Sequence, residues 1–234
     1  MHYLCRVDRV AAITGGAGAI GGAIATALRD AGHAVAILDR EAEFAVDLSD
    51  EDAVRAVANR VLAQMGRCDV LVHAAAAFDR AALDELDAET WRRVQAVNVE
   101  SALWLAQAFV PGMAQRGFGR IVMIVSDTVF HPPVPDLLPY VASKAALIGV
   151  ARSLARSLGA SHITVNCVAP GLTRTPAAEA GMPEAAFEHV RAQQALPRTL
   201  VPEDVSGVVA FLASDAAGAI TGQTLCPDGG LVLR

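Results

Sequence analysis

The stretch TGGAGAIG, residues 14–21, decides the fold of this chain. It follows the short apolar run VAAIT, residues 10–14, and leads directly into a segment with helical spacing. Glycines let a backbone turn tightly and approach a pyrophosphate, and the free N–H groups at the start of a helix stabilise its charge. The stretch therefore predicts a phosphate-binding turn between a strand and a helix. The alternative is a turn with only a structural role.

Strand-like and helix-like segments alternate along the rest of the chain. Short β-branched runs, typical of strands buried on both faces of a parallel sheet, cover residues 10–14, 34–39, 69–74, 121–126 and 163–170. Segments rich in Ala, Leu, Arg and Glu at helical spacing cover residues 20–31, 51–65, 90–115, 138–158 and 202–213. This order predicts the α/β fold class: a single-domain Rossmann fold over residues 1–234, with a doubly wound parallel sheet and helices on both faces.

The composition determines which partners are expected. Hydrophobic residues make up 53% and charged residues 19% of the 234 residues, which provides for one large core and excludes the signature of a disordered chain. The net charge of -6, with acids and bases interspersed, gives no basic face for a phosphate backbone or an anionic bilayer. We therefore expect a small-molecule partner, no nucleic acid and no membrane.

The cysteines and the first residues carry no metal or targeting signal. The four cysteines are widely spaced, without a C-x-x-C pair or a histidine at zinc-ligand spacing, so no metal is expected and the thiols are expected to be reduced. The segment MHYLCRVDRV has no basic region followed by an apolar core, and no apolar run approaches the roughly 20 residues that span a bilayer. A cytoplasmic location is the resulting expectation.

Asp39 bears on which dinucleotide binds. It ends the second expected strand, about twenty residues after the glycine-rich turn, where an acid accepts hydrogen bonds from an adenosine ribose. A carboxylate there also repels a 2′-phosphate, which favours NAD over NADP. Arg40 follows immediately and is the residue that would reach such a phosphate, so the use of NADP stays open. The alternative for Asp39 is a solvated charge at a strand end.

A catalytic pair lies in YVASK, residues 140–144, at the start of an expected helix. Tyr140 and Lys144 are an (i, i+4) pair and share one helix face. A phenol titrates near a pH of about 10 and needs a neighbouring cation to act as acid or base near neutrality, which Lys144 supplies. Ser126, at the end of the preceding strand, is placed to donate a hydrogen bond to a substrate oxygen that develops negative charge.

With these motifs the chain resembles the short-chain dehydrogenase/reductase family over essentially its whole length. TGGAGAIG resembles the family's T-G-x-x-x-G-x-G turn, and Ser126 with YVASK resembles its serine and Y-x-x-x-K signature. Asp47-Leu48 resembles its adenine-contacting pair, and Asn98 in AVNVES resembles its helix asparagine. VAPGLTRTP, residues 168–176, resembles the segment that borders the nicotinamide, and ITGQTLCPDGG, residues 220–230, resembles its closing strand.

The resemblance implies an oxidoreductase that transfers a hydride between NAD(H) and a ketone or secondary alcohol. Tyr140 would be the general acid or base, Lys144 would lower its pKa and bind the nicotinamide ribose, and Ser126 would hold the substrate oxygen. Asn98 would keep a helix open around a water that links Lys144 to solvent. The implied cofactor-binding residues are Gly15, Gly18, Ala19, Ile20, Gly21, Asp39, Asp47, Leu48, Ala74, Ala75, Tyr140, Lys144, Pro170, Gly171, Thr173 and Thr175.

Three departures from the family pattern carry expectations of their own. Ala19 replaces a glycine of the turn, so the backbone there must avoid a positive φ. HAAA at residues 73–76 replaces Asn-Asn-Ala-Gly, and His73 is expected to be buried and hydrogen-bonded rather than catalytic. Only seven residues separate Asp39 from Asp47, so the helix that the family normally has there is expected to be absent, which leaves the adenine edge open.

The substrate is expected to lie between the loop from Ser126 to Tyr140 and the loop of residues 172–200. Large apolar residues in both favour an apolar or aromatic ketone or secondary alcohol over a phosphorylated sugar: Phe130, Val134, Leu137, Leu138, Met182 and Phe187. An NADPH-dependent 3-oxoacyl reductase, a sugar or polyol dehydrogenase and a non-catalytic dinucleotide-binding protein stay as alternatives.

The resemblance also implies a homo-oligomer, expected to be a homotetramer. Such enzymes pair two long helices across a twofold axis, and the helices expected here carry Leu103, Leu105, Phe109, Ile148 and Leu154. The alternative is that all five side chains belong to the chain's own core.

Overall fold

Short β-branched runs form the strands of one parallel sheet, in a computed structural model that describes residues 9–233. The spatial order of the strands is β3 (Phe44–Ala45), β2 (Ala34–Asp39), β1 (Val10–Thr14), β4 (Val70–His73), β5 (Gly119–Ile124), β6 (Ile163–Val168) and β7 (Thr224–Leu225). The chain order reverses between β1 and β4, where Thr14 lies beside His73. Ligands of open α/β sheets bind at this switch point, beyond the carboxyl ends of the strands.

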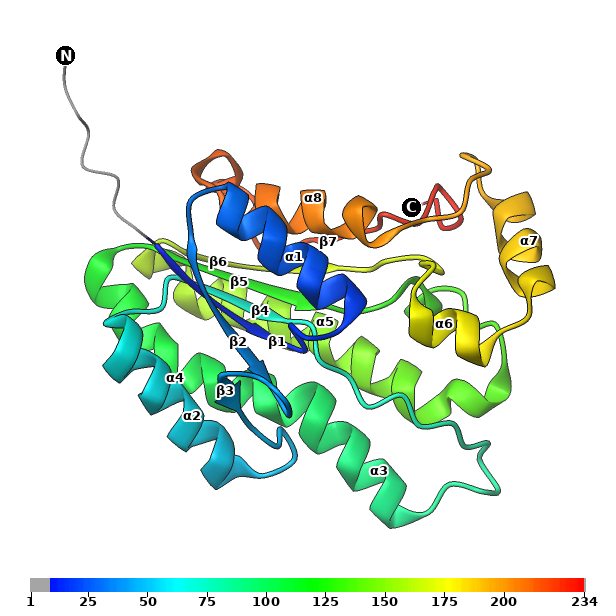
Figure 1. Cartoon of the computed structure of the whole chain (residues 1–234), viewed down its shortest axis with the longest axis horizontal. Coiled ribbons are helices and arrows are strands. Elements are labelled where there is room, and N and C mark those ends of the chain that lie inside the picture. The colour runs from blue at the N-terminus through cyan, green and yellow to red at the C-terminus, as the bar shows by residue number, and fades with distance from the viewer. Residues whose placement is uncertain (1–8, 234) are drawn as a thin grey trace.

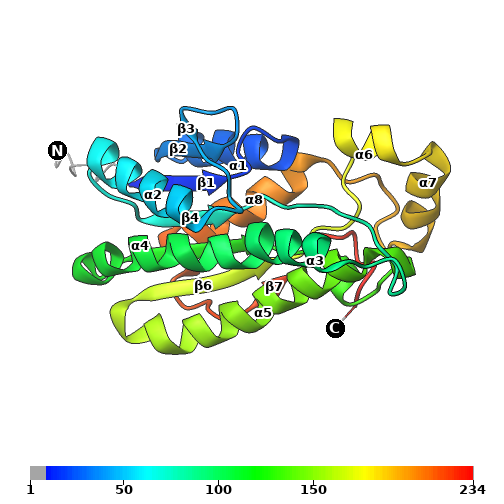
Figure 2. The same ribbon diagram turned by 90° about the horizontal axis from the view of Figure 1, so that it is seen from below.

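Helices cover both faces of the sheet, as the sequence predicted (Figure 1). One face carries α1 (Ala19–Asp30) and α8 (Pro202–Ala213). The other face, seen in Figure 2, carries α2 (Glu51–Met65), α4 (Ser101–Arg116) and α5 (Leu138–Leu158). Each face buries its own apolar cluster against the strands, which is how a doubly wound sheet excludes water on both sides.

Two segments differ from their predicted form. The helix expected over residues 90–115 is three pieces: α3 (Ala88–Gln95), a π-helical turn (Ala96–Glu100) and α4. The segment of residues 172–200, expected to be a loop, contains α6 (Pro176–Gly181) and α7 (Glu184–Gln193), which lie at the carboxyl end of the sheet (Figure 1). Both differences place backbone near the expected site.

No helix occurs between Asp39 and Asp47, as expected from the short spacing. The two-residue strand β3 takes its place, and the N–H of Val46 donates to the carbonyl of Asp39 at 3.1 Å. The sheet therefore has a short edge strand, β3, in place of the crossover helix that the family normally has between these two positions.

The apolar residues assigned to an oligomer interface lie mostly inside the chain's own core. Leu105, Phe109 and Ile148 are 0%, 1% and 6% exposed, so that part of the prediction was wrong. They pack between the sheet, α4 and α5, while Leu103 and Leu154 are only partly buried.

Within the described residues, one stretch is long and apolar enough to cross a membrane, by length and composition only: Pro135–Ser161 around α5. Its Leu147 and Ala151 are buried in the cluster beneath the sheet, and α5 packs along β6. These are the contacts of a core helix.

Candidate active site

The glycine-rich turn fits closely between β1 and the end of β4. Gly15 has a φ of +67°, and a Cβ there would lie 2.7 Å from Cα of Ala75. A Cβ on Gly21 would lie 2.1 Å from the carbonyl oxygen of Gly15. Both positions therefore require glycine. Ala19 has no positive φ, as expected: within residues 9–233 only His162 adopts one among non-glycine residues.

The first turn of α1 is open to an anion. Its N-cap residue, Gly18, makes no side-chain capping bond, and the first turn contains no acid. The N–H groups of Ala19, Ile20 and Gly21 are therefore left without side-chain acceptors, at the positive end of the helix. This uncapped terminus after a tight turn fits the pyrophosphate of a dinucleotide.

Asp39 is held at the rim of the same turn. Its Oδ2 accepts from the N–H of Ala17 at 3.1 Å, and its Oδ1 accepts from the N–H of Arg40 at 2.7 Å. Both oxygens are acceptors only, so the carboxylate can take further hydrogen bonds from ribose hydroxyls but offers nothing to a phosphate. The position fits the predicted role in ribose recognition.

The predicted adenine pair divides into two roles. Asp47 is exposed, and the backbone N–H and hydroxyl of Ser49 bond its Oδ1 at 2.9 and 2.7 Å, which lowers the pKa of Asp47. Leu48 is buried in the core. A separate cavity of about 260 Å³ is lined by Ala17 and by residues of α1, β2 and the turn after β2, and neither Asp47 nor Leu48 contributes to it.

His73 links the turn to the π-helical segment. Thr14 Oγ1 accepts from the N–H groups of Ala74 and Ala75 at 3.1 and 3.2 Å, so its own hydrogen is directed to His73 Nδ1 at 3.0 Å. Nε2 of His73 then donates to the carbonyl of Asn98 at 3.0 Å. Complete burial, helped by a nearby cation, lowers the pKa of His73 to about 3. The ring is neutral and hydrogen-bonded at both nitrogens, as expected.

Asn98 occupies the π-helical turn Ala96–Glu100 and connects three elements. Its side-chain amide donates to the carbonyl of Ala77 at 3.0 Å and to Ser143 Oγ at 2.9 Å, and its Oδ1 accepts from the N–H of Ala77 at 2.7 Å. The turn is a local expansion of the helix, a feature often found at functional sites. Asn98 thus holds the loop after β4 against α5, because Ala77 lies in that loop and Ser143 lies on α5, directly before Lys144.

Lys144 is the only lysine in the sequence; all other strongly basic side chains are arginines. It is 1% exposed, and its Nζ donates to the carbonyl of Ile124 at 2.8 Å. Burial lowers the pKa of Lys144 to about 8. An ammonium whose pKa shifts on burial is a property that arginine lacks, so a solitary buried lysine indicates a chemical role.

Tyr140 lies beside Lys144, whose Nζ is 5.5 Å from the ring centroid. Burial raises the pKa of Tyr140 to about 12, a hydrogen bond with Ser126 lowers it, and the charge of Asp127 raises it. The expectation that Lys144 lowers this pKa is therefore not met in the protein alone, because the loss of water around the phenol dominates. The phenol is neutral and keeps its proton in the protein alone.

The Ser126 hydroxyl has several polar neighbours besides Tyr140. Its Oγ accepts from the N–H and Oγ1 of Thr128 at 3.2 and 2.9 Å and donates to Asp127 Oδ1 at 3.3 Å. Burial, and then the charge of Asp228, raise the pKa of Asp127 to about 6. Sequence reasoning missed Asp127, although a charged residue directly after an apolar strand was a usable signal.

Phe78 is a second residue that sequence reasoning missed. Its ring meets that of Tyr140 edge to face, with centroids 4.7 Å apart and planes at 68°. It is 49% exposed, so an apolar surface beside the phenol remains accessible. Nothing in the chain between β4 and α3 identified this contact, because it depends on how the loop crosses α5.

The segment after β6 runs beside the same groups. The carbonyl of Pro170 accepts from the N–H of Asp127 at 3.1 Å, and a Cβ on Gly171 would lie 2.9 Å from Cα of Asp228. Thr173 Oγ1 donates to the carbonyl of Gly171 at 2.9 Å. The predicted nicotinamide border therefore lies against the serine that ends β5.

Some predicted site residues serve other purposes. Thr175 Oγ1 caps α6 by accepting from the N–H of Ala178 at 3.1 Å. Leu137 and Phe187, expected to line the substrate side, are each 4% exposed, and Phe187 packs under the guanidinium of Arg174. Those two assignments were wrong because both side chains are buried within the protein and do not face an open substrate site. Between residues 9 and 233, no cluster of three or more His, Cys, Asp or Glu side chains is arranged to hold a metal.

Known proteins share both the sequence and the fold. The family described as Enoyl-(Acyl carrier protein) reductase matches residues 15–232. The chain is 34% identical over 244 residues to the probable galactose dehydrogenase GalD of Rhizobium meliloti (strain 1021), covering 96% of this chain and 95% of that protein. It is 36% identical over 241 residues to the cis-4-hydroxycyclohexanecarboxylate dehydrogenase of Sinomonas cyclohexanicum, covering 95% and 96%.

A solved structure agrees with the architecture. YwfH, an NADPH dependent reductase involved in bacilysin biosynthesis, superposes with a TM-score of 0.89 at 26% identity, covering 97% of this chain and 99% of that one. The chain belongs to the short-chain dehydrogenase/reductase family. It is thereby a pyridine-nucleotide-dependent oxidoreductase of small molecules.

Proposed function

We propose that the protein is an NAD(H)-dependent oxidoreductase that interconverts a ketone and a secondary alcohol, with Tyr140 as the general acid or base. The observation that carries this proposal is the sole lysine, buried beside Tyr140 at the end of the sheet where the uncapped helix α1 begins. A structural dinucleotide-binding fold has no need to bury an ammonium there. Asp39, an acceptor-only group at the ribose position, supports NAD over NADP.

Each residue of the site has a defined task in this proposal. The bound nicotinamide cofactor supplies or takes up the hydride. Tyr140 gives its proton to the carbonyl oxygen in reduction and takes it back in oxidation. Ser126 turns its hydroxyl from Asp127 to the substrate oxygen, where charge develops. Lys144 binds the nicotinamide ribose and supplies positive charge near the phenol. Asn98 holds the π-helical turn between α3 and α4 in place next to Lys144.

The surroundings of Tyr140 support an apolar, cyclic substrate. Phe78 and Val134 are 49% and 39% exposed, and Phe78 touches the phenol ring directly. A flat or puckered apolar ring would cover Phe78 while its oxygen meets Tyr140. The relative that acts on a hydroxycyclohexane carboxylate is consistent with this choice.

A sugar or polyol is the second candidate, because of Asp127. Its carboxylate lies one hydrogen bond from the Ser126 hydroxyl and is an acceptor for a hydroxyl next to the reacting carbon. A relative is named as a probable galactose dehydrogenase. A panel of cyclic ketones, cycloalkanols and aldoses, each assayed with both cofactors, distinguishes the two candidates.

We predict a preference for NADH that depends on Asp39. At equal, subsaturating concentrations the unmodified protein should turn over NADH faster than NADPH. Asp39→Ser should raise the rate with NADPH, because it removes the charge that repels a 2′-phosphate. The ratio of the NADH rate to the NADPH rate should fall by about tenfold. Arg40→Ser, which leaves Asp39 in place, tests the opposite contribution and should lower the rate with NADPH while leaving the rate with NADH unchanged. A faster rate with NADPH in the unmodified protein would contradict the assignment.

We also predict that Asp127→Asn moves the pH profile. Asp127 carries a negative charge that raises the pKa of Tyr140, so its removal should lower the apparent pKa of alcohol oxidation by about half a unit. Oxidation needs the phenolate, so its rate rises with pH and the rising limb should shift to lower pH. Thr128→Ser is the control. An unchanged or upward-shifted limb would show that Asp127 does not act on the phenol.

Assembly and location remain proposals. We propose a homotetramer in the cytoplasm, supported for assembly by the family and by Leu103 and Leu154, which stay partly exposed on α4 and α5. Light scattering gives the mass directly.

A further inference from the structure

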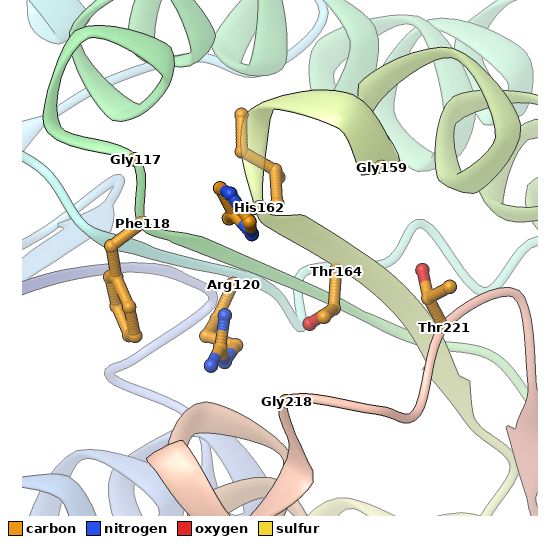
Figure 3. A pocket seen from close by; sticks show the side chains of 9 residues that line it. Gly117, Phe118, Arg120, Gly159, His162, Thr164, Gly218 and Thr221 are labelled. Carbon is orange, nitrogen blue, oxygen red and sulfur yellow. The ribbon is translucent and has the colours of Figure 1, made fainter.

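A cavity of about 260 Å³ lies at the amino ends of the strands, away from the edge where the glycine-rich turn and Tyr140 lie. Three loops enclose it: the one before β5, the 3-10 turn Gly159–Ser161 before β6, and the loop that follows the 3-10 turn Asp215–Ala217. None of its lining residues belongs to the candidate active site. Figure 3 shows Arg120, His162, Thr164 and Thr221 around this space.

Arg120 is the central group of the cavity. It is 4% exposed, its Nε donates to the carbonyl of Ser214 at 3.1 Å, and its Nη1 donates to the carbonyl of Gly119 at 2.9 Å. Its Nη2 makes no hydrogen bond to any described residue. Burial, and to a smaller extent the charge of Arg9, lower the pKa of Arg120, while the charge of Asp215 raises it. Guanidinium groups match the oxygen spacing of phosphates and carboxylates, so an open Nη2 favours an oxyanion.

The nearest acid does not neutralise Arg120. Asp215 pairs with Arg9 at 2.8 Å, and both Arg9 and Arg120 lie over the ring of Phe118, at 3.7 and 4.2 Å from its centroid. Two guanidinium groups therefore share one carboxylate. Arg9, Arg120 and Asp215 together carry one net positive charge, in a chain whose overall charge is -6.

Two hydroxyls complete the set of donors. Thr164 is 6% exposed, and its Oγ1 makes no hydrogen bond to a residue in the described part of the chain; Figure 3 shows this oxygen on the side of Arg120. Thr221 Oγ1 accepts from the N–H of Val165 at 3.0 Å, which leaves its hydrogen free to be donated. His162 lies above the guanidinium at the mouth of the cavity. Arg120 lies on β5, Thr164 on β6 and Thr221 on the loop before β7, so the donors that line the cavity come from three separate elements of the fold.

We propose that this cavity binds a phosphate-type oxyanion, held by Arg120 Nη2 and the hydroxyls of Thr164 and Thr221. A tetrahedral anion accepts hydrogen bonds from several directions at once, which matches donors that come from two neighbouring strands and a loop. The free anion and the phosphate of a small phosphomonoester share this chemistry, and the cavity volume admits either.

Methyl NMR of the full chain, labelled at isoleucine, tests the proposal with an internal control. Ile163 lines the cavity and Ile20 lies in the glycine-rich turn, where phosphate would also bind. Inorganic phosphate, titrated at constant ionic strength against chloride, should produce a saturable shift of Ile163. A phosphomonoester that shifts Ile163 at lower concentration than inorganic phosphate identifies the esterified source, and the reverse order identifies the free anion.

Paired variants locate the donors. Thr164→Val keeps the side-chain shape and every bond of Arg120, and should weaken the Ile163 response about tenfold. Arg120→Lys should abolish it. Thr26→Val and Arg156→Lys, both at exposed helix positions, should leave it unchanged. A shift confined to Ile20, no saturable shift of Ile163, or an equal response in Thr164→Val would overturn the site.

Discussion

Tyr140→Phe should bind the cofactor almost as well as the unmodified protein but lose about a hundredfold or more of its turnover. The substitution keeps the ring, its contact with Phe78 and its place beside Lys144, and removes only the transferable proton. General acid–base catalysis contributes about 10²–10⁴ in rate, so the loss should appear in kcat. Cofactor binding is measured by fluorescence titration and turnover by absorbance of the reduced nicotinamide.

Phe78→Leu is the matched control for this prediction. It changes the same ring contact without touching the proton, and should alter KM more than kcat. Turnover of the Tyr140→Phe variant within a few-fold of the unmodified protein, on the same substrate, would remove Tyr140 from the mechanism.

Lys144→Met should be more damaging, because it affects both the cofactor and the chemistry. The methionine fills the buried space but provides neither the charge near Tyr140 nor a donor for a ribose hydroxyl. Cofactor affinity should fall by about tenfold and turnover by more than about a hundredfold. Lys144→Arg should not rescue either, since a guanidinium is larger and does not fit a site with 1% exposure. Circular dichroism establishes that each variant is folded.

Because the chain has one lysine, the pKa of Lys144 is directly measurable. Lysine labelled with ¹³C at Cε should give a single side-chain signal that titrates near 8, well below the usual value of about 10.4. The ammonium should thus be present below pH 8 and be lost as the pH rises through that value. A titration midpoint above 10 would contradict the burial of Lys144. Losses of cofactor affinity and turnover in Lys144→Met that are no larger than those caused by surface substitutions would contradict its role.

The regular elements could be predicted because their patterns are local. The helices Glu51–Met65, Leu138–Leu158 and Pro202–Ala213 begin and end where the hydrophobic spacing predicted, and the parallel, doubly wound sheet followed from the alternation of strands and helices. The π-helical turn could not, because it depends on hydrogen bonds from Asn98 to Ala77 and Ser143, which are distant in sequence.

The candidate site divides along the same line. Residue types at fixed spacing pointed to Ser126, Tyr140 and Lys144, whereas the pKa of Tyr140 depends on how completely the fold removes water from the phenol. Phe78 enters the site through a loop crossing that leaves no pattern in the sequence, whereas Asp127 could have been found from its place directly after an apolar strand. Leu137 and Phe187 failed for the opposite reason, since apolar residues in loops often bury themselves within the loop.

Deuterium transfer from the nicotinamide tests the central claim most directly. The protein is incubated with NADH deuterated at C4 and the cyclic ketone that turns over fastest in the panel, and the alcohol is analysed by mass spectrometry and NMR. We predict one deuterium on the carbinol carbon, from one face of the nicotinamide only, with the transfer nearly abolished in Tyr140→Phe. Alcohol without deuterium on that carbon from either of the two C4-deuterated stereoisomers of NADH, or equal transfer in the Tyr140→Phe variant, would contradict the account.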